Sequence, residues 1–414
     1  SMAKEIPQIL KGFRDYLPQE QLARKKIMQK ISEVFERFGF APMDTPALEY
    51  YELLGGKYGE EGEQLMYKFE DQGGRKVAMR YDLTVPMARF VASYPELPKP
   101  FKRYQMAPVW RADKPQKGRY REFMQCDVDI IGSDSIIADA EVIATFDAAF
   151  KSLEIGEVKV KFNDRKLVDQ VLTKLNIVKK DIGNFMRTLD KLDKIGEEKV
   201  VESLVEQGFD RNILKKYSQL MEKSSKGYVN QMTQLLSGLG VEQMEFDKYL
   251  MRGLVYYTGI VFEFVLVAKP EFGSVCGGGR YDDLLEKTTG VKMPAVGGSI
   301  GLDRLFAAIQ EMDVVAPQTA AEVIVFNLDE NLTADYLNMT TNLRNAGIDA
   351  EVVYEPSKLD KQFKYAQAKN MQVAVIFGPD EASARKVTLK NLREKEQRTV
   401  DLANLVAEVK SMLW

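Results

Sequence analysis

Residues 110–130 read WRADKPQKGRYREFMQCDVDI, and this stretch decides the expected fold of the chain around it. From residue 122 onward polar and apolar residues alternate, which is typical of a β-strand with one buried face and one polar face. The polar face carries Gln125, Asp127 and Asp129, while the apolar residues between them point into a core. The stretch therefore predicts a strand whose polar face bears an amide and two carboxylates.

A second strand-like segment, KRYQMAPVWR, precedes the polar loop KPQKGR. It carries Arg103, Gln105 and Arg111 at one parity, and a hairpin would place them beside the polar face of the next strand. Antiparallel sheets commonly expose one face to water, so a solvated face is one interpretation. Short Asp and Gln side chains beside Arg also suit bidentate recognition of a charged ligand, and the segment alone supports both interpretations equally.

The bulk composition indicates a globular chain of more than one domain. Its 414 residues exceed what one core usually supports, and 45% hydrophobic with 29% charged residues is ordinary for a soluble protein. The net charge is −3, so any contact with nucleic acid would need local basic patches. No apolar run approaches the roughly 18 residues of a membrane span and no signal-peptide core is visible, so we expect a cytoplasmic location without membrane contact.

The chain contains no histidine. This excludes Ser-His-Asp and Cys-His catalysis, His-ligated metals and an unshifted general base that titrates near neutrality. The two cysteines, Cys126 and Cys276, lie in apolar segments and are expected to be small buried residues. Chemistry must come from Arg, Asp, Glu, Gln, Tyr, Lys, backbone groups or a bound cation.

The spacing of apolar residues predicts an α+β fold, with an antiparallel sheet flanked by helices. Helices are expected at residues 19–38, 84–93, 136–153 and 301–312. Strands are expected at residues 76–81, 101–110, 122–131, 158–162, 252–267 and 294–300.

The pattern changes twice along the chain. Residues 164–245 are amphipathic and helical, which predicts an insertion that divides the sheet domain into 1–163 and 246–315. Its mixed charges fit a solvated subdomain and an RNA-contacting one about equally. After a linker at 313–321, residues 320–414 alternate strands and helices, which predicts a small α/β domain with a largely parallel sheet.

Two glycine-containing segments are candidates for ligand contact. GGSIGLDRLFAAI joins a strand to a helix, whose first amides together with Arg304 could hold an anion such as phosphate. A glycine turn for tight packing explains this segment better when it is taken in isolation. VCGGGRYDDLL has three consecutive glycines shortly before Tyr281, which marks a bulge or a ligand lying against the backbone.

Two further segments carry candidate side chains. MRGLVYYTGIVFEF contains Arg252, Tyr256 and Tyr257, and each tyrosine alone is more readily explained as a core aromatic. AMRYDLTVPMARF leads a strand into a helix, where Asp82 or Thr84 could act as an N-cap or as a ligand group.

The joint order of these segments resembles that of class II aminoacyl-tRNA synthetases, and among them the histidyl-tRNA synthetases. KGFRDYLP and GFAPMDTPALE resemble the family's opening and motif 1, with Pro46 as its proline, which implies a homodimer. Arg111, the KPQKGR loop and REFMQ resemble motif 2, and GGSIGLDRLF resembles motif 3. RGLVYYTG with CGGGRYDDL resembles the pair specific to histidine, while KLDKQFKYAQAKN and VAVIFGPDE resemble the C-terminal anticodon-binding domain.

The resemblance implies ATP-dependent ligation of L-histidine to tRNA(His) through a histidyl-adenylate. Arg111 would hold the α-phosphate of ATP and Arg304 the γ-phosphate, with Phe123 stacking on adenine. The implied ATP-binding residues are Arg111, Arg119, Arg121, Glu122, Phe123 and Arg304. The implied histidine-binding residues are Asp82, Thr84, Gln125, Asp129, Tyr256, Tyr257 and Tyr281. The implied catalytic residues are Arg252 and Arg111, and no protein-bound metal is expected.

The chemistry suits a chain without histidine. The substrate carboxylate is already ionised when it attacks the α-phosphorus, so positioning and positive charge from arginines and from the Mg²⁺ that accompanies ATP are required, and a general base is not. A buried imidazole needs partners for both ring nitrogens, which tyrosine hydroxyls and a carboxylate can provide.

Some alternatives stay open at this level. Val255 stands where the family most often has Asp, and strand parity groups Arg252 with Tyr256 and not Tyr257, so the tyrosine that faces the ligand is undetermined. A synthetase-like regulatory subunit of histidine biosynthesis is the main rival, although such proteins typically lack the C-terminal domain and the catalytic arginines. A catalytically inactive RNA-binding module would lose the pocket formed by Gln125 and Asp129.

Overall fold

The computed structural model describes residues 7–116, 118–251, 257–313 and 319–413. They form two compact units, one from the described residues of Ser1–Asp15 and Ile27–Val314 and the other from those of Tyr16–Lys26 and Val315–Trp414. Among the described residues, no helix combines the length and the apolarity needed to cross a bilayer.

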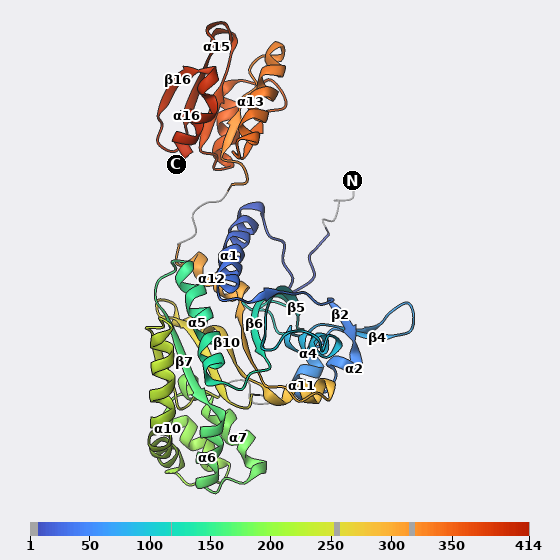
Figure 1. The fold of residues 1–414 in the computed structure, drawn as a ribbon, viewed down its shortest axis with the longest axis vertical. Coiled ribbons are helices and arrows are strands. Elements are labelled where there is room, and N and C mark those ends of the chain that lie inside the picture. The colour runs from blue at the N-terminus through green and yellow to red at the C-terminus, as the bar shows by residue number, and fades with distance from the viewer. Residues whose placement is uncertain (1–6, 117, 252–256, 314–318, 414) are drawn as a thin grey trace, which may run out of the picture. The chain divides into compact units, whose positions relative to one another are not determined.

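An eight-stranded sheet lies at the centre of the first unit (Figure 1). From β5 to β7 each described strand is antiparallel to the next, whereas the edge pairs β1/β5 and β7/β8 are parallel. The expected α+β architecture with an antiparallel sheet is confirmed. In sheet order, the strands are β1 (Ala41–Pro42), β5 (Phe101–Trp110), β6 (Glu122–Ile131), β11 (Ala295–Gly301), β10 (Ser274–Arg280), β9 (Ile260–Leu266), β7 (Val158–Asp164) and β8 (Met244–Phe246).

One face of this sheet is covered by α5, whose first turn is capped by Ser135. The ring of Phe146 on α5 lies 6.0 Å from that of Phe262 and 6.3 Å from that of Phe264, centroid to centroid. Val128 on β6 belongs to the same apolar layer, so its alternating neighbours point to the other face. The helices expected from the sequence are α1 (Pro18–Arg37), α4 (Thr84–Ser93), α5 (Ile136–Ser152) and α12 (Leu302–Glu311).

Residues 165–238 are helical and have their own core. The helical segment leaves the sheet after β7, where the Asp164 carboxylate accepts from the Lys166 and Leu167 amides at 2.7 and 3.3 Å and starts the first helix. Phe185 and Tyr217 are fully buried in its core, with 5.9 Å between ring centroids. The helices are α6 (Arg165–Lys174), α7 (Lys179–Leu189), α8 (Leu192–Ile195), α9 (Glu197–Glu206) and α10 (Ile213–Gly238).

A small three-stranded sheet, β2-β4-β3, belongs to the first unit as well. Its register places Leu48, Tyr50 and Phe69 on one face, and all three side chains are exposed. Glu49 points the other way and pairs with Arg89 on α4 at 2.7 Å. The elements here are β2 (Leu48–Tyr50), α2 (Tyr51–Leu54), α3 (Gly59–Leu65), β3 (Lys68–Glu70), β4 (Lys76–Met79) and α11 (Asp282–Thr289).

The second unit contains a five-stranded sheet in the order β13-β12-β14-β15-β16. The pairs β13/β12 and β12/β14 are parallel as expected, whereas β14/β15 and β15/β16 are antiparallel, so the sheet is mixed and not largely parallel. The hairpin of β15 and β16 was not predicted from the sequence. β15 has two apolar residues and β16 has one, which is too few to give a clear strand pattern. The elements are β12 (Val323–Val325), α13 (Thr333–Asn345), β13 (Ala350–Val352), α14 (Leu359–Ala368), β14 (Val373–Ile376), α15 (Pro379–Ala384), β15 (Lys386–Asn391), β16 (Gln397–Asp401) and α16 (Leu405–Leu413).

Candidate active site

A buried charge cluster lies on the β5–β6 hairpin. The register pairs Arg103 with Asp129 and Gln105 with Asp127. The Arg103 side chain has no exposed surface, and its Nη2 lies 2.6 Å from Asp129 Oδ2 and 3.7 Å from Asp127 Oδ2. The polar face predicted from the sequence is therefore not a solvated surface, since its charges are paired within the protein.

Glycines on the neighbouring strands leave room for this cluster. Gly297 on β11 pairs with Asp129, and a Cβ atom at Gly297 would lie 1.8 Å from Asp129 Oδ1. A Cβ atom at Gly279 on β10 would lie 2.8 Å from the Tyr257 ring. The Tyr281 hydroxyl, just beyond β10, donates to Asp129 Oδ1. Absence of side chains at two strand positions thus allows the side chains of Asp129, Tyr257 and Tyr281 to converge.

A cavity of about 250 Å³, named here the acidic cavity, lies against Gly297 and its neighbour Gly298. Asp82 accepts from the Val85 amide at 3.1 Å and from the Tyr58 hydroxyl at 2.8 Å, so it both starts α4 and lines the cavity. In the described part of the chain, the buried oxygens Gln125 Oε1 and Asp127 Oδ1 have no hydrogen-bond partner. The polar and aromatic lining residues are Asp82, Thr84, Arg111, Gln125, Asp127, Asp129, Tyr257, Tyr281 and Ser299.

The three carboxyl groups that line this cavity have raised pKa values. Burial raises the pKa of both Asp127 and Asp129, and the charge of Arg103 opposes this change. Burial likewise raises the pKa of Asp82, against the hydrogen bonds from Val85 and Tyr58. Three buried carboxyl groups around one cavity favour a ligand that carries a cationic group and hydrogen-bond donors.

A second cavity of about 280 Å³, the basic cavity, adjoins the first. Arg111 Nε donates to the Tyr81 carbonyl at 2.9 Å, and its guanidinium carbon lies 4.3 Å from the Tyr81 ring centroid and 5.2 Å from that of Phe123. These contacts fix the arginine at the cavity wall. The charged and aromatic lining residues are Arg111, Asp113, Arg119, Tyr120, Phe123, Asp303 and Arg304.

The first turn of α12 forms one wall of the basic cavity. Asp303 accepts from the Met124 amide at 2.6 Å and pairs with Arg14, which joins α12 to β6 and to the N-terminal segment. Arg304 Nη1 donates to the Ser274 carbonyl at 2.8 Å and lines the cavity. The location expected for Arg304, in the first turn after the β11 glycines, is confirmed.

The two cavities share part of their lining. The shared residues are Arg111, Gln125, Gly277, Ser299 and Gly301. A ligand in the acidic cavity and a ligand in the basic cavity would therefore meet beside the Arg111 guanidinium. Such adjacency is what a reaction between two bound substrates requires.

Two of the expected ATP-binding residues lie outside both linings. Arg121 donates to the carbonyls of Asp113 and Lys11 at 3.1 and 3.3 Å, and so holds the N-terminal segment against the hairpin loop. Glu122 accepts from Trp110 Nε1 at 2.6 Å. Contact of either residue with ATP stays a prediction.

Three residues considered in the sequence analysis, Arg252, Val255 and Tyr256, lie outside the described residues. Their expected roles also stay predictions. Tyr257 is described and lines the acidic cavity.

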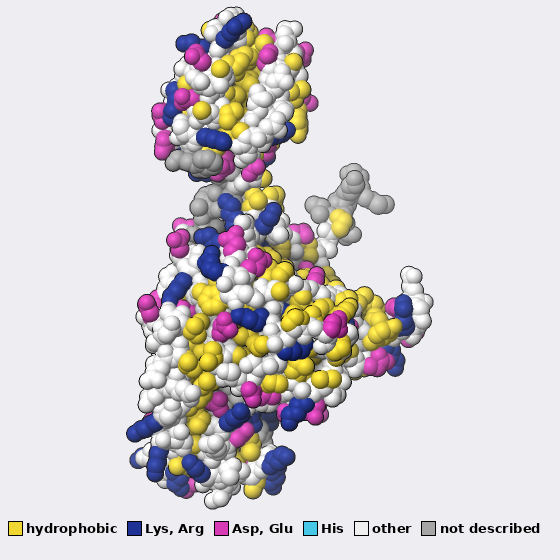
Figure 2. Space-filling view, viewed as in Figure 1, with side chains coloured by type: hydrophobic (Ala, Val, Ile, Leu, Met, Phe, Trp, Pro, Cys, Tyr) yellow, Lys and Arg dark blue, Asp and Glu magenta, His cyan; other side chains and the backbone are white. Residues whose placement is uncertain are grey.

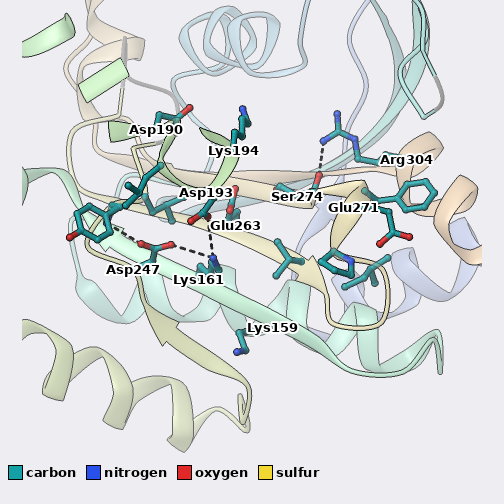
Figure 3. A pocket seen from close by; sticks show the side chains of 18 of the residues that line it. Lys159, Lys161, Asp190, Asp193, Lys194, Asp247, Glu263, Glu271, Ser274 and Arg304 are labelled. Carbon is teal, nitrogen blue, oxygen red and sulfur yellow. Dashed lines mark hydrogen bonds and ion pairs between the residues drawn. The ribbon is translucent and has the colours of Figure 1, made fainter. Parts of the chain in front are cut away.

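A third and larger cavity of about 1530 Å³ extends from the basic cavity along β7 and β9 to α8 (Figure 3). Arg304 and Ser274 lie at one end, and Asp190 and Asp247 lie toward the other (Figure 3). Between them, Lys161 Nζ is 3.4 Å from Asp247 Oδ2 and 3.6 Å from Asp193 Oδ2. No pattern in the sequence predicts this cavity, because its walls come from segments far apart in the chain.

Three residues in or next to the acidic cavity had no role predicted from the sequence. Arg103 and Asp127 were visible through strand parity, but parity does not distinguish a buried charge from a solvated one. Ser299 gave no signal beyond its place in the glycine-rich strand β11. Only the register between strands brings the three together.

The antiparallel sheet, the β5–β6 hairpin and the β11–α12 junction around two adjoining cavities define the catalytic domain of a class II aminoacyl-tRNA synthetase. The family model "Histidyl-tRNA synthetase" matches residues 12–305, and the model "Anticodon binding domain" matches residues 322–412. The chain belongs to the histidyl-tRNA synthetase family.

Relatives match over nearly the whole chain. A histidine–tRNA ligase of Rhodopirellula baltica is 41% identical over 95% of each chain, and one of Wolinella succinogenes is 39% identical over 97% of this chain and 98% of its own. The crystal structure of a histidyl-tRNA synthetase from Nostoc sp. PCC 7120 has 32% identity and a TM-score of 0.89, covering 99% of this chain and 100% of that one. The regulatory-subunit alternative is not favoured, since the full-length relatives are ligases and the anticodon-binding domain is present.

Proposed function

We propose that this chain ligates L-histidine to tRNA(His) with ATP, through a histidyl-adenylate intermediate. The observation that carries the proposal is the shared lining of the two cavities at Arg111. Histidine in the acidic cavity would present its carboxylate to the α-phosphate of ATP in the basic cavity. Membership of the histidyl-tRNA synthetase family supports the identity of both substrates.

The acidic cavity provides the groups that the amino acid needs. The ammonium group would bind Asp82, Thr84 and Gln125 Oε1, the last of which is a buried acceptor without a protein partner among the described residues. The imidazole would bind Asp129, Tyr281 and one of the tyrosines that follow Arg252. Arg252 itself is assigned to the substrate carboxylate and the α-phosphate by family resemblance alone.

The basic cavity provides cations and an aromatic ring for ATP. Arg111 would contact the α-phosphate, Arg304 the γ-phosphate, and Phe123 the adenine ring, with Arg119 at the cavity mouth. Mg²⁺ would enter with the triphosphate as part of the substrate, since this ion is held mainly through phosphates in such sites. Attack by an ionised carboxylate needs no general base. Fixed positive charge near the α-phosphorus would stabilise the transition state of this attack.

The tRNA would reach the adenylate through the third cavity, which opens beside Arg119 and Arg304. Its lining lysines, Lys159 and Lys194, suit the phosphate backbone of an acceptor end. Among the charged side chains that Figure 2 shows over the end of the first unit formed by α6, α7 and α10, most are Lys and Arg. The C-terminal domain would bind the anticodon, as its family model indicates.

We also propose that the chain forms a homodimer and acts in the cytoplasm. The exposed apolar face of the small sheet, with Leu48, Tyr50 and Phe69, supports a homodimer, because such faces are usually covered by a partner. The activity is placed in the cytoplasm, where translation occurs.

The test is histidine-dependent exchange of pyrophosphate into ATP, followed by charging of a tRNA(His) transcript. Exchange that requires histidine and is not supported by the other amino acids is expected. A folded protein without such exchange would rule the synthetase function out. Exchange without charging would confine the proposal to the activation step.

A further inference from the structure

Arg103 is a buried cation that belongs to neither cavity lining. It lies directly behind the acidic cavity, where its Nη2 is 2.6 Å from Asp129 and 3.7 Å from Asp127. Its other contacts are weak, with 3.4 Å to Gln105 Oε1 and 3.4 Å to the Leu83 carbonyl. The strongest interaction of this arginine is therefore with the carboxylate assigned to the imidazole.

Two carboxylates share this one buried cation. Two carboxylates that lie close together in a low-dielectric site repel each other, so one of them binds a proton. A nearby cation opposes this protonation and keeps both groups ionised. The other charged groups that face the pair are Asp82 and Arg111 across the cavity and Arg80 behind it. Among the described residues, Arg103 is the cation in ion-pair contact with both carboxylates.

The ionisation state of Asp129 decides what it can recognise. An ionised carboxylate only accepts hydrogen bonds, whereas a protonated one also donates. Asp129 already accepts from Tyr281 on Oδ1 and contacts Arg103 through Oδ2. Its remaining lone pairs can accept an imidazole N–H, which selects the ring nitrogen that carries the proton.

We propose that Arg103 is a positioning residue that holds Asp129 ionised and oriented, so that the site binds histidine in one imidazole tautomer. Asp127 is the second anion of the same network and makes the counter-charge necessary. This inference rests on the proposed function, since it assigns the specificity of that function's amino-acid site.

The experiment measures the KM for histidine in pyrophosphate exchange between pH 6 and 9 for the wild type, Arg103→Met and Arg103→Lys. The ratio of variant to wild-type KM removes the titration of free histidine, which is common to all proteins. For Arg103→Met the ratio is expected to be about fivefold at pH 6 and about twofold at pH 7, as for a carboxyl pKa raised by about one further unit from about 6, and to approach one by pH 9. Arg103→Lys keeps the charge and should retain a smaller, flatter ratio.

The matched control is Lys102→Met. Lys102 is the adjacent residue on β5, and its side chain pairs with Glu141 at 2.9 Å on the other face of the sheet. The histidine KM of Lys102→Met should equal that of the wild type at every pH. The KM for ATP should stay within about twofold of the wild-type value in all variants, because Arg103 does not line the basic cavity.

A double variant covers the case in which Arg103→Met does not fold. Arg103→Met combined with Asp127→Asn removes one cation and one anion together, so the remaining carboxylate should stay ionised and the KM ratio should be nearly flat with pH. A pH-independent ratio for Arg103→Met, or a KM ratio of the double variant that rises steeply toward pH 6, would overturn the proposal. Absence of exchange in the wild type would defeat the proposed function instead.

Discussion

Gly297 and Asp129 occupy paired positions on β11 and β6, and a methyl group on Gly297 would lie 1.8 Å from the Asp129 carboxylate. The Asp129 side chain cannot keep its place if residue 297 has a Cβ atom. Two neighbouring strand positions therefore act together, one supplying the carboxylate and the other the space for it.

Gly297→Ala is expected to displace Asp129 and to raise the histidine KM by at least about tenfold, since a buried charged hydrogen bond contributes roughly 1.5–3 kcal/mol. The measurement is pyrophosphate exchange at varied histidine. Gly227→Ala is the control, because no atom lies within 4 Å of its would-be Cβ on α10. A normal histidine KM for Gly297→Ala would show that Asp129 does not contact the amino acid.

Arg111→Gln is expected to lower the exchange rate by about 10²–10³-fold, the usual cost of removing one preorganised stabilising group. Arg121→Gln is the informative comparison, because its guanidinium contacts the Asp113 and Lys11 carbonyls and lies outside both cavity linings. We expect its exchange rate to fall much less. Equal losses of exchange rate in the two variants would indicate that Arg121 also contacts ATP.

The protein without bound histidine should lose stability as the pH rises through the pKa of the Asp127 carboxyl group. Burial raises the folded pKa of this group, so the folded state binds more protons than the unfolded state above about pH 4. The free energy of unfolding therefore decreases as pH increases toward neutrality. The Asp127→Asn variant has no titrating group at this position, so the stability of the wild type relative to this variant should fall by roughly 1–2 kcal/mol between about pH 5 and pH 7.

Urea unfolding at a series of pH values measures this difference. A histidine-saturated sample should show a smaller pH effect, since the bound ammonium favours ionised carboxylates. A stability difference that does not change with pH would mean that Asp127 is ionised throughout.

Charge on the exposed face of the small sheet should prevent dimer formation. Tyr50 and Phe69 both pair with Val77 and are 57% and 50% exposed, so Tyr50→Lys with Phe69→Lys adds two cations to one apolar face. Sedimentation velocity is expected to give a dimer for the wild type and a monomer for this variant. Tyr354→Lys, at a 91% exposed position on the second unit, should leave the mass unchanged.

A dimer that survives both charges would place the interface elsewhere. A monomeric wild type with full exchange activity would remove the homodimer from the proposal.

Much of the fold followed from periodicity, because alternation and helical stripes reflect local backbone geometry. The predicted strands at 101–110 and 122–131 coincide with β5 and β6, and the predicted helix at 84–93 coincides with α4. The hairpin of β15 and β16 was missed, because β15 has only two apolar residues and β16 only one, which is too short an alternation to indicate a strand.

Sequence order and parity by themselves determined the α+β class, the polar face that bears Gln125, Asp127 and Asp129, and the resemblance to one synthetase family. Tertiary structure decided that Asp127 and Asp129 on this face are buried, because pairing across strands places Arg103 behind Asp129 and Gly297 beside it. It also separated Arg111, at the junction of two cavities, from Arg121, which holds the N-terminal segment. Parity fixes the direction of a side chain from local geometry, whereas burial and charge pairing depend on residues that are distant in the sequence.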